Sequence, residues 1–256
     1  MLACLLLLAA QGFIEEGIKL FQAGQLQQAA AQFQRAAEQE PENALAWKLL
    51  GTSFAALGDH EQAREPLRKA CALNPKLPDA CFYHARNLYL VNRFEESRKL
   101  FESLLASDPQ PWRIENGLGL ALEALGKAED AEARYRKSAS LNPSSHPNEH
   151  PLINLGVLLG RQGRTAGAER VLRTAVEKAP QSTRAWFELG RMLQELGRNP
   201  ESAAALEKSI AIDPRHWAAH ALLGKVYLRL GRTEDGRRHL ETGSKGLTQS
   251  QTPPHI

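Results

Sequence analysis

Charge of one sign, aromatic residues and long apolar segments are all scarce in this sequence. Lysine and arginine number 32 and aspartate and glutamate 29, so the net charge of +3 is too balanced to indicate a nucleic-acid partner. Aromatic residues make up 6% of the chain, which argues against an aromatic-rich groove for glycans. Met1–Ala10 is nearly all apolar but too short to cross a bilayer, so we expect no integral membrane span.

Motifs that carry catalysis are also missing. No glycine-rich phosphate loop follows a strand, because no strands are expected. His146 and His150 have a spacing that metal sites use, but they flank prolines and have no third ligand nearby. We interpret His216, His220 and His239 as surface or packing histidines. The sequence therefore predicts no catalytic residues, no metal site, no cofactor and no enzymatic activity.

Proline keeps a regular interval along most of the chain. The first four periodic prolines are 34 residues apart, and two more, again 34 apart, follow after one step of 37. They are Pro41, Pro75, Pro109, Pro143, Pro180 and Pro214. A fixed period of this length is the sequence sign of a repeat architecture. The repeats leave no room for a separate catalytic domain.

Glycine keeps the same period at two positions. The first set lies within an apolar-periodic stretch, at Gly17, Gly51, Gly119, Gly156, Gly190 and Gly224, with Ala85 as the exception. The second set follows seven residues later, at Gly24, Gly58, Gly126, Gly163, Gly197 and Gly231, with Asn92 as the exception. Glycine, and after it asparagine, tolerates the left-handed backbone that follows a helix end. A second apolar-periodic stretch follows each of these positions, and the periodic proline ends it. Each repeat is therefore predicted to be a helix–turn–helix hairpin that must stack on its neighbours.

The residues within a repeat resemble the tetratricopeptide repeat family, whose unit carries Trp, Leu-Gly, an aromatic, Ala, Phe and Pro at set spacings. The second repeat matches at Trp47, Leu50, Gly51, Phe54, Gly58, Ala63, Leu67, Ala70 and Pro75. The sixth matches at Trp186, Leu189, Gly190, Leu193, Gly197 and Pro214. The resemblance implies an all-α fold, a right-handed superhelical solenoid of antiparallel helix hairpins with about 14 helices.

We expect three parts: an apolar segment at 1–10, the solenoid at 11–243 and a disordered tail at 244–256. The repeats lie near 10–43, 44–77, 78–111, 112–145, 149–182, 183–216 and 217–243. A longer loop at 144–151 holds the extra residues of the 37-residue step and should divide the solenoid into four repeats and three. Gly236 and Gly243 predict a weak second helix in the last repeat.

In the family that the sequence resembles, the first helix of each hairpin lines a concave face that binds partners. We therefore predict a peptide-binding groove on this face, formed by Lys48, Thr52, Phe82, Tyr83, Arg86, Tyr89, Arg113, Asn116, Asn154, Arg161, Arg184, Phe187, Arg191 and Lys225. Arginine can grip carboxylates with its planar fork, aromatic rings offer flat apolar surface, and asparagine can bond a peptide backbone. The expected occupant is an extended or helical segment of acidic character. The alternative is an ordinary solvated helix face.

The apolar segment Met1–Ala10 is similar to the apolar region and cleavage site of a secretory signal, with cleavage near Ala10 or Gln11. A positively charged start is missing, so a helix that caps the first repeat and a retained membrane anchor stay open as alternatives. The signal predicts export to the bacterial periplasm, the cell envelope or the medium, and the cytoplasm is the alternative.

Three cysteines give weak information on compartment. Cys4 would leave with a cleaved signal. Cys71 ends one hairpin and Cys81 begins the next, so stacking can bring them close, and an exported protein could oxidise them. The sequence favours the alternative, two small buried core residues without a bond.

These observations predict a non-enzymatic scaffold or adaptor that binds a protein or peptide segment in the concave groove. The alternative is an envelope-associated subunit that binds glycan or polysaccharide-assembly machinery. The sequence names neither the partner nor the oligomeric state.

Overall fold

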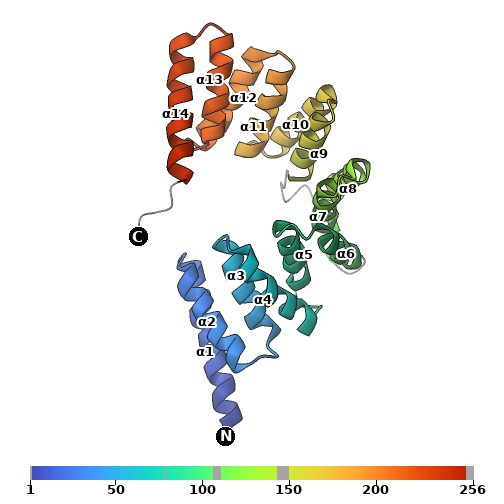
Figure 1. The fold of residues 1–256 in the computed structure, drawn as a ribbon, viewed down its shortest axis with the longest axis vertical. Helices are drawn as coiled ribbons and strands as arrows, with labels where there is room; N and C mark the ends of the chain where they lie inside the picture. Colours follow the sequence, from blue (N-terminus) through green and yellow to red (C-terminus); the bar gives the residue numbers. More distant parts are fainter. Residues whose placement is uncertain (1, 78, 106–110, 143–149, 252–256) are drawn as a thin grey trace. The chain divides into compact units, whose positions relative to one another are not determined.

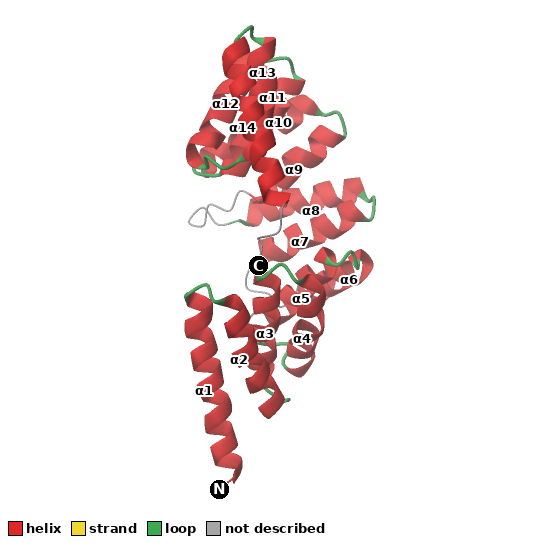
Figure 2. Cartoon of the chain, turned by 60° about the vertical axis from the view of Figure 1, so that its left-hand side comes forward, coloured by secondary structure: helices red, strands yellow, loops and turns green. Residues whose placement is uncertain are grey.

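The structure is a computed structural model that describes residues 2–77, 79–105, 111–142 and 150–251. In these ranges the chain forms 14 α-helices and no strand. Figure 2 colours the helices red and the loops between them green. The helices (Figure 1) are α1 (Leu2–Gln22), α2 (Leu26–Gln39), α3 (Ala44–Ala56), α4 (His60–Leu73), α5 (Ala80–Leu90), α6 (Phe94–Leu104), α7 (Pro111–Ala124), α8 (Ala128–Leu141), α9 (His150–Arg161), α10 (Thr165–Lys178), α11 (Thr183–Glu195), α12 (Asn199–Ile212), α13 (Trp217–Arg229) and α14 (Thr233–Gln251).

Glycine and proline end the helices where the period predicts. The glycines between paired helices all have φ between 73° and 81°: Gly24, Gly58, Gly126, Gly163, Gly197 and Gly231. Asn92 takes their place in the third repeat with a φ of 60°, a conformation that asparagine adopts more readily than other side chains. α2 ends at Gln39, just before Pro41, and α10 ends at Lys178, just before Pro180. Both helix stops predicted from the sequence are therefore confirmed at these positions.

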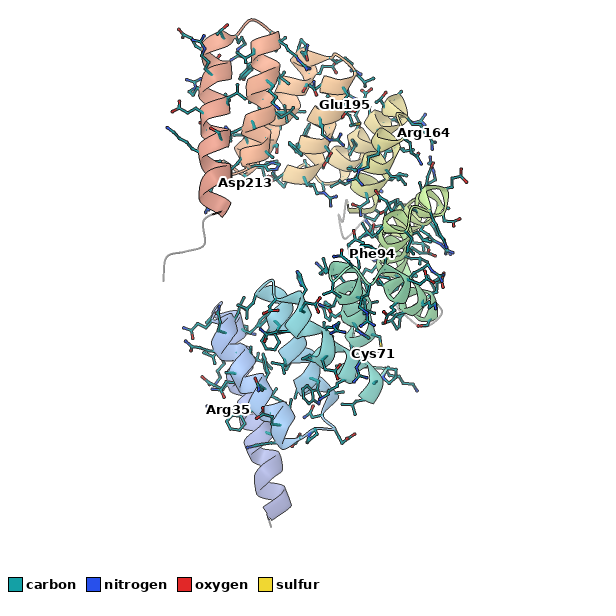
Figure 3. All side chains as sticks on the ribbon, viewed as in Figure 1. Arg35, Cys71, Phe94, Arg164, Glu195 and Asp213 are labelled. Atoms are coloured by element: carbon teal, nitrogen blue, oxygen red, sulfur yellow. A yellow bond between two sulfur atoms is a disulfide. The ribbon has the colours of Figure 1, made fainter. Side chains whose placement is uncertain are left out.

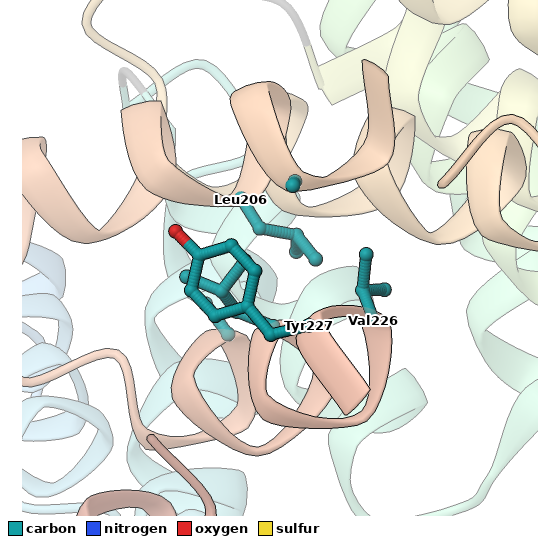
Figure 4. Packing of buried hydrophobic residues seen from close by; sticks show 6 residues of the cluster. Leu206, Val226 and Tyr227 are labelled. Carbon is teal, nitrogen blue, oxygen red and sulfur yellow. The ribbon is translucent and has the colours of Figure 1, made fainter. Parts of the chain in front are cut away.

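One bulky side chain in each hairpin fills the space between the two helices. Phe33, Leu67, Phe101, Tyr135, Leu172 and Leu206 are fully buried. The facing helix approaches closely because it carries glycine: a Cβ at Gly51 would lie 2.6 Å from Leu67 Cγ, and one at Gly190 would lie 2.7 Å from Leu206 Cγ. Figure 4 shows how Leu206 of α12 also packs against Val226 and Tyr227 of α13, so neighbouring hairpins share a core.

A hydrogen bond to a periodic proline joins successive repeats. The indole nitrogens of Trp47 and Trp186 donate to the carbonyl oxygens of Pro41 and Pro180, both at 2.8 Å. His220 stands at the equivalent position of the last repeat, and its Nε2 lies 3.2 Å from the carbonyl oxygen of Pro214. His220 is 9% exposed, as expected for a packing histidine that replaces tryptophan.

The third repeat uses a covalent bond where others use this hydrogen bond. Cys81 occupies the tryptophan position, and its sulfur is bonded to that of Cys71 on α4, with 4.6 Å between the two Cα atoms. Figure 3 marks Cys71. The interpretation of these cysteines as unbonded core residues is therefore wrong. Stacking of α4 on α5 brings the Cα atoms of Cys71 and Cys81 within the usual range for a disulfide.

The chain divides into two compact halves, residues 1–131 and 132–256. The sequence predicted the division at the longer loop 144–151, most of which lies outside the described residues. The boundary instead falls within α8. Glu132, just after it, accepts a 2.6 Å hydrogen bond from Arg164 at the start of α10, which ties the body of α8 to the C-terminal half.

The last repeat departs from one prediction. α14 continues to Gln251, so residues 244–251, expected in a disordered tail, are helical. Its glycines allow close packing on α13, while the expected weakness of this helix stays a prediction. A Cβ at Gly243 would lie 2.7 Å from the backbone nitrogen of Ala221, and one at Gly246 would meet the ring of Trp217. Residues 252–256 lie outside the described part.

Odd- and even-numbered helices differ in their neighbours within each half. α5 contacts both α3 and α7, and α11 contacts both α9 and α13. Among the described residues, no even-numbered helix makes a comparable contact with the next even-numbered one. In each half, odd-numbered helices therefore contact one another across repeats, and we call the surface that the odd-numbered helices present in each half the odd-helix face.

His84 of α5 makes the N-terminal half sensitive to acid. Burial and the nearby Arg68 guanidinium lower the pKa of His84 to about 4, whereas an unfolded histidine titrates near 6.5. Between these values the unfolded chain binds a proton that the folded chain does not, so stability falls as pH falls. Because the ring is only half-buried and solvent screens it, we expect a loss of about 2 kcal/mol between pH 7 and pH 4.

Urea denaturation at both pH values checks this expectation. The wild type should lose more unfolding free energy between pH 7 and pH 4 than the His84→Gln variant does. The difference between the two losses is the part due to His84, because the other groups titrate alike in both proteins. Equal losses in the two proteins would show that His84 does not carry the effect.

Candidate functional site

The odd-helix face holds the residues that the sequence assigned to the groove, in two separate sets. In the N-terminal half, α3 carries Lys48 and Thr52, α5 carries Phe82, Tyr83, Arg86 and Tyr89, and α7 carries Arg113 and Asn116. In the C-terminal half, α9 carries Asn154 and Arg161, α11 carries Arg184, Phe187 and Arg191, and α13 carries Lys225. The groove assignment stays a prediction, but the structure shows which of these side chains are already engaged.

Two arginines of the predicted groove are held by acidic partners within the protein. Arg113 lies 2.9 Å from Asp79 Oδ1, and its guanidinium stacks 4.0 Å from the centre of the Phe82 ring. Arg191 lies 2.9 Å from Glu188 and 2.7 Å from Glu195. These guanidinium groups already bind carboxylates, so a ligand would have to compete for them.

Several other predicted residues also have internal contacts. Arg184 donates a 3.0 Å hydrogen bond to Asn154, which is 6% exposed. Phe187 packs on His216 with 4.8 Å between ring centres. Tyr89 packs on Phe94 of α6 with 5.6 Å between ring centres.

Arg86 and Lys225 are exposed and, unlike these residues, have no internal polar partner among the described residues. Within the part of the chain that the structure describes, neither has a hydrogen bond or an ion pair. Each half therefore presents an exposed cation on its odd-helix face that is available to an acidic ligand.

Arg86 stands beside a pocket of about 280 Å³ in the N-terminal half. Three predicted groove residues, Thr52, Tyr83 and Arg86, line it. The remaining walls come from α1, α3, α4 and α5, and include Phe21, Ala55, Ala56, His60, Asn87 and Leu90. The pocket brings together the first three repeats.

Most of these walls were not predicted from the sequence. Ala55 and Ala56 lie one helical turn after Thr52, so helical spacing from that residue could have indicated them. Phe21 and Leu90 could not be assigned to the pocket from the sequence, because their exposed fractions, 37% and 39%, are known only from the folded structure. Asn87 could not be assigned from the sequence, because the predicted face of α5 already contained the adjacent residue Arg86.

Asn87 is the most unusual polar residue of the pocket. It is 2% exposed, and its side-chain nitrogen donates a 2.9 Å hydrogen bond to the backbone oxygen of His60. That bond fixes the amide orientation, because the reverse would set two acceptors face to face. Among the described residues, no group donates to Asn87 Oδ1, and the buried Nδ1 of His60 is also without a partner.

Metal-binding clusters and membrane-spanning helices are absent from the described residues. These residues contain no cluster of three or more His, Cys, Asp or Glu side chains that could hold a metal ion. No helix in the same ranges has the length and apolar character required to cross a membrane. His146 lies outside the described residues, and the side chain of His150 is also not described.

The fold and its repeated glycine, proline and bulky positions define an all-α stack of antiparallel helix hairpins. The family model described as "Tetratricopeptide repeat" matches residues 14–78, 84–146 and 153–214, and a second model with the same description matches 193–250. The chain therefore belongs to the tetratricopeptide repeat family. The predicted fold class is confirmed, and the helices described correspond to about seven repeats.

Curated relatives match parts of the chain. It is similar to Protein bimA of Emericella nidulans, with 26% identity over 39% of this chain and 12% of the relative. It is also similar to Tetratricopeptide repeat protein 7A of Homo sapiens, with 36% identity over 30% of this chain and 8% of the relative. A third relative is the Protein STIP1 homolog of Dictyostelium discoideum, with 30% identity over 47% of this chain and 22% of the relative. The chain thus spans a small part of the length of these relatives.

Solved structures share the fold along most of the chain. A tetratricopeptide repeat protein from Parabacteroides merdae has a TM-score of 0.70 and 19% identity, covering 93% of both chains. The protein pilF of Pseudomonas aeruginosa has a TM-score of 0.64 and 21% identity, covering 80% of this chain and 92% of its own. At these identities the likeness to solved structures shows the fold alone. The tetratricopeptide repeat fold that the family model identifies is a scaffold consistent with protein–protein interaction.

Proposed function

We propose that this protein is a non-enzymatic scaffold that binds an acidic segment of another protein on the odd-helix face, chiefly across α1, α3 and α5. The observation that carries the proposal is the pocket on this face, with the exposed cation Arg86 beside it. Stacked hairpins offer extended surfaces of this kind for partner proteins.

The charges of the face support an acidic ligand. Arg113 and Arg191 bind carboxylates of the protein itself, whereas Arg86 and Lys225 have no hydrogen bond or ion pair among the described residues. An arginine–carboxylate bond in a partly dry site is among the stronger polar contacts that proteins form. The scaffold would therefore select its segment in part by a carboxylate placed against Arg86.

We further propose that the scaffold works in an oxidising compartment, such as the periplasm or cell envelope. The Cys71–Cys81 disulfide supports this setting, because such bonds form and persist mainly outside the reducing cytosol.

Replacing Arg86 by glutamate should weaken binding of an acidic segment about 10- to 100-fold, the effect of losing a charge-assisted hydrogen bond. Selection of a displayed random-peptide library on the full chain supplies the ligands. Fluorescence polarisation of the enriched peptides then measures their dissociation constants for wild type and variant.

Lys99→Glu is the matched control, because Lys99 is exposed on the even-numbered helix α6 of the same half. It changes the net charge equally and should leave affinity within about twofold, as a distant surface charge does. Equal losses in both variants would indicate a general charge effect and contradict the site. Failure to enrich any peptide, with binding to a glycan array instead, would overturn the proposal in favour of a glycan ligand.

A further inference from the structure

We propose that two histidines between the last two helices form a pH-sensitive switch, which holds α14 against α13 at neutral pH and releases it when both rings are protonated. The residues are His220 of α13 and His239 of α14. The inference goes beyond the proposed function, because it concerns the response of the C-terminal half to acid and involves no ligand.

Hydrogen bonds fix where the protons of this pair lie at neutral pH. His220 Nε2 is 3.2 Å from the carbonyl oxygen of Pro214, and a carbonyl oxygen only accepts, so Nε2 carries the proton of the neutral ring. His220 Nδ1 is then an acceptor. It lies 2.9 Å from Nδ1 of His239, which therefore carries a proton and donates it.

Acid removes the bond between the two rings. A first proton can bind at Nε2 of His239 and leave the bond intact. A second proton can bind only at Nδ1 of His220, and it sets two N–H donors and two positive charges against each other across 2.9 Å. The closed pair therefore binds one proton fewer than two separated rings do.

The charged groups near His239 act in both directions. Burial is the largest influence and lowers the pKa of His239, and the nearby His220 and Arg238 lower it further. Asp235 on α14 and Glu207 on α12 raise it, but less than burial lowers it. The closed state thus disfavours protonation of this ring.

Two other titratable groups lie beside the pair. Tyr227 packs on His239 with 5.5 Å between ring centres, and burial raises the pKa of its hydroxyl to about 12, so it stays neutral. His216 precedes α13, and burial lowers its pKa as well. His216 remains in every variant described below, so its own response to pH cancels in the comparison.

Apolar burial holds α14 less firmly than it holds the other second helices. In the first six hairpins a bulky side chain of the second helix is fully buried, whereas the equivalent Leu240 is only half-buried. Within the described residues α14 packs mainly on α13, and Figure 1 shows it as the outermost helix of the C-terminal half. A terminal helix with little buried apolar surface opens locally at low cost, so one hydrogen bond can decide its docking.

Opening of α14 should increase as pH falls through about 6.5, the ordinary pKa of a separated histidine. The closed state keeps its full stability above this value and loses it below, because the open state then binds the additional proton. One such proton raises the ratio of open to closed molecules about tenfold between pH 7.5 and pH 5.5.

Hydrogen exchange of the full chain, followed by mass spectrometry, measures this opening. After correction for the intrinsic exchange rate, protection of peptides from residues 233–251 should fall about tenfold between the two pH values. Peptides from α11 and α12 should keep their protection within about twofold. Constant protection of α14, or an equal fall in all three helices, would contradict the switch.

His239→Asn removes the titration and keeps the bond. Its amide stands where Nδ1 stood and can turn to donate to a neutral His220 or to accept from a charged one. We expect α14 to stay protected at pH 7.5 and its response to acid to fall below about twofold. His84→Gln is the matched control, because it removes a histidine of the N-terminal half and should keep the tenfold response.

A double variant keeps the test decisive if α14 no longer docks in His239→Asn. The equivalent positions of the sixth repeat, 34 residues earlier, hold Trp186 and Ala205. His220→Trp combined with His239→Ala rebuilds that pair, and the indole can donate to the carbonyl oxygen of Pro214. A tenfold response in either variant would show that the two histidines are not the switch.

The wild type offers a test that needs no substitution. Imidazole nitrogen shifts measured by NMR at pH 7.5 should place the proton of His220 on Nε2 and that of His239 on Nδ1. The reverse arrangement would overturn the proposal, because acid would then not remove the bond in the way described.

Discussion

Replacing Phe33 by alanine should lower the free energy of unfolding of the N-terminal half by about 3–5 kcal/mol, the usual cost of emptying a buried aromatic site. Phe33 is 0% exposed and belongs to a cluster with Ala29, Ala30 and Leu50. Its ring fills the space left by the missing side chain of Gly17, where a Cβ would lie 2.5 Å from the ring. No neighbouring side chain can close this gap without moving a helix.

Phe33→Leu is the matched control, because leucine occupies the equivalent position in four other repeats, as Leu67, Leu172, Leu206 and Leu240. It should cost less than about 1.5 kcal/mol, since it keeps most of the volume. Urea denaturation followed by circular dichroism gives the total, and hydrogen exchange of peptides from residues 1–131 assigns the loss to the N-terminal half. Equal stability of both variants would contradict the role given to this position.

Removing the disulfide should destabilise the same half by about 2–3 kcal/mol. The bond closes a loop with a sequence separation of 10 between Cys71 and Cys81, which restricts the unfolded chain. The double variant Cys71→Ala and Cys81→Ala keeps small apolar side chains in the two sites. Its denaturation midpoint should match that of reduced wild-type protein and should not change with reductant.

Thiol titration of the unfolded, unreduced full chain provides the control. With three cysteines in the sequence, the structure predicts one reactive thiol before reduction and three after it. Three thiols before reduction, in protein produced under oxidising conditions, would show that the two cysteines do not pair.

The periodic features of the fold could be predicted from the sequence because each has a local cause. A residue past a helix end needs left-handed backbone, so Gly58 and Asn92 indicated turns without knowledge of the tertiary structure. A bulky residue facing glycine recurs because every hairpin solves the same packing problem, as Leu67 and Gly51 show.

Contacts between repeats could not be predicted in this way. Arg113 and Asp79 are 34 residues apart, one full repeat, and their pairing depends on how two hairpins stack. The disulfide between Cys71 and Cys81 also depends on how two hairpins stack, whereas the sequence alone favoured two unbonded cysteines. The packing role of the glycines of α14 was missed, because their low helix propensity is visible in the sequence, whereas the close approach to α13 at Gly243 is visible only in the packed pair.

The candidate site was partly predictable, because helical spacing can be read from the sequence. Helical spacing placed Thr52, Tyr83 and Arg86 on one face, and all three line the pocket. Arg113 and Arg191 received equal weight in the prediction, because sequence alone does not show that acidic side chains of the protein already hold them. The position of Asn87 Oδ1 depends on a hydrogen bond across repeats and has no sequence pattern.

The most direct test of the binding face is NMR mapping of the full chain with the tightest display-selected peptide. We predict that shift changes concentrate on α1, α3 and α5, including Ala55, Tyr83 and Arg86, and that they weaken in parallel with affinity in Arg86→Glu. Shift changes confined to the even-numbered helices, or to α13 and α14, would contradict the proposed binding face.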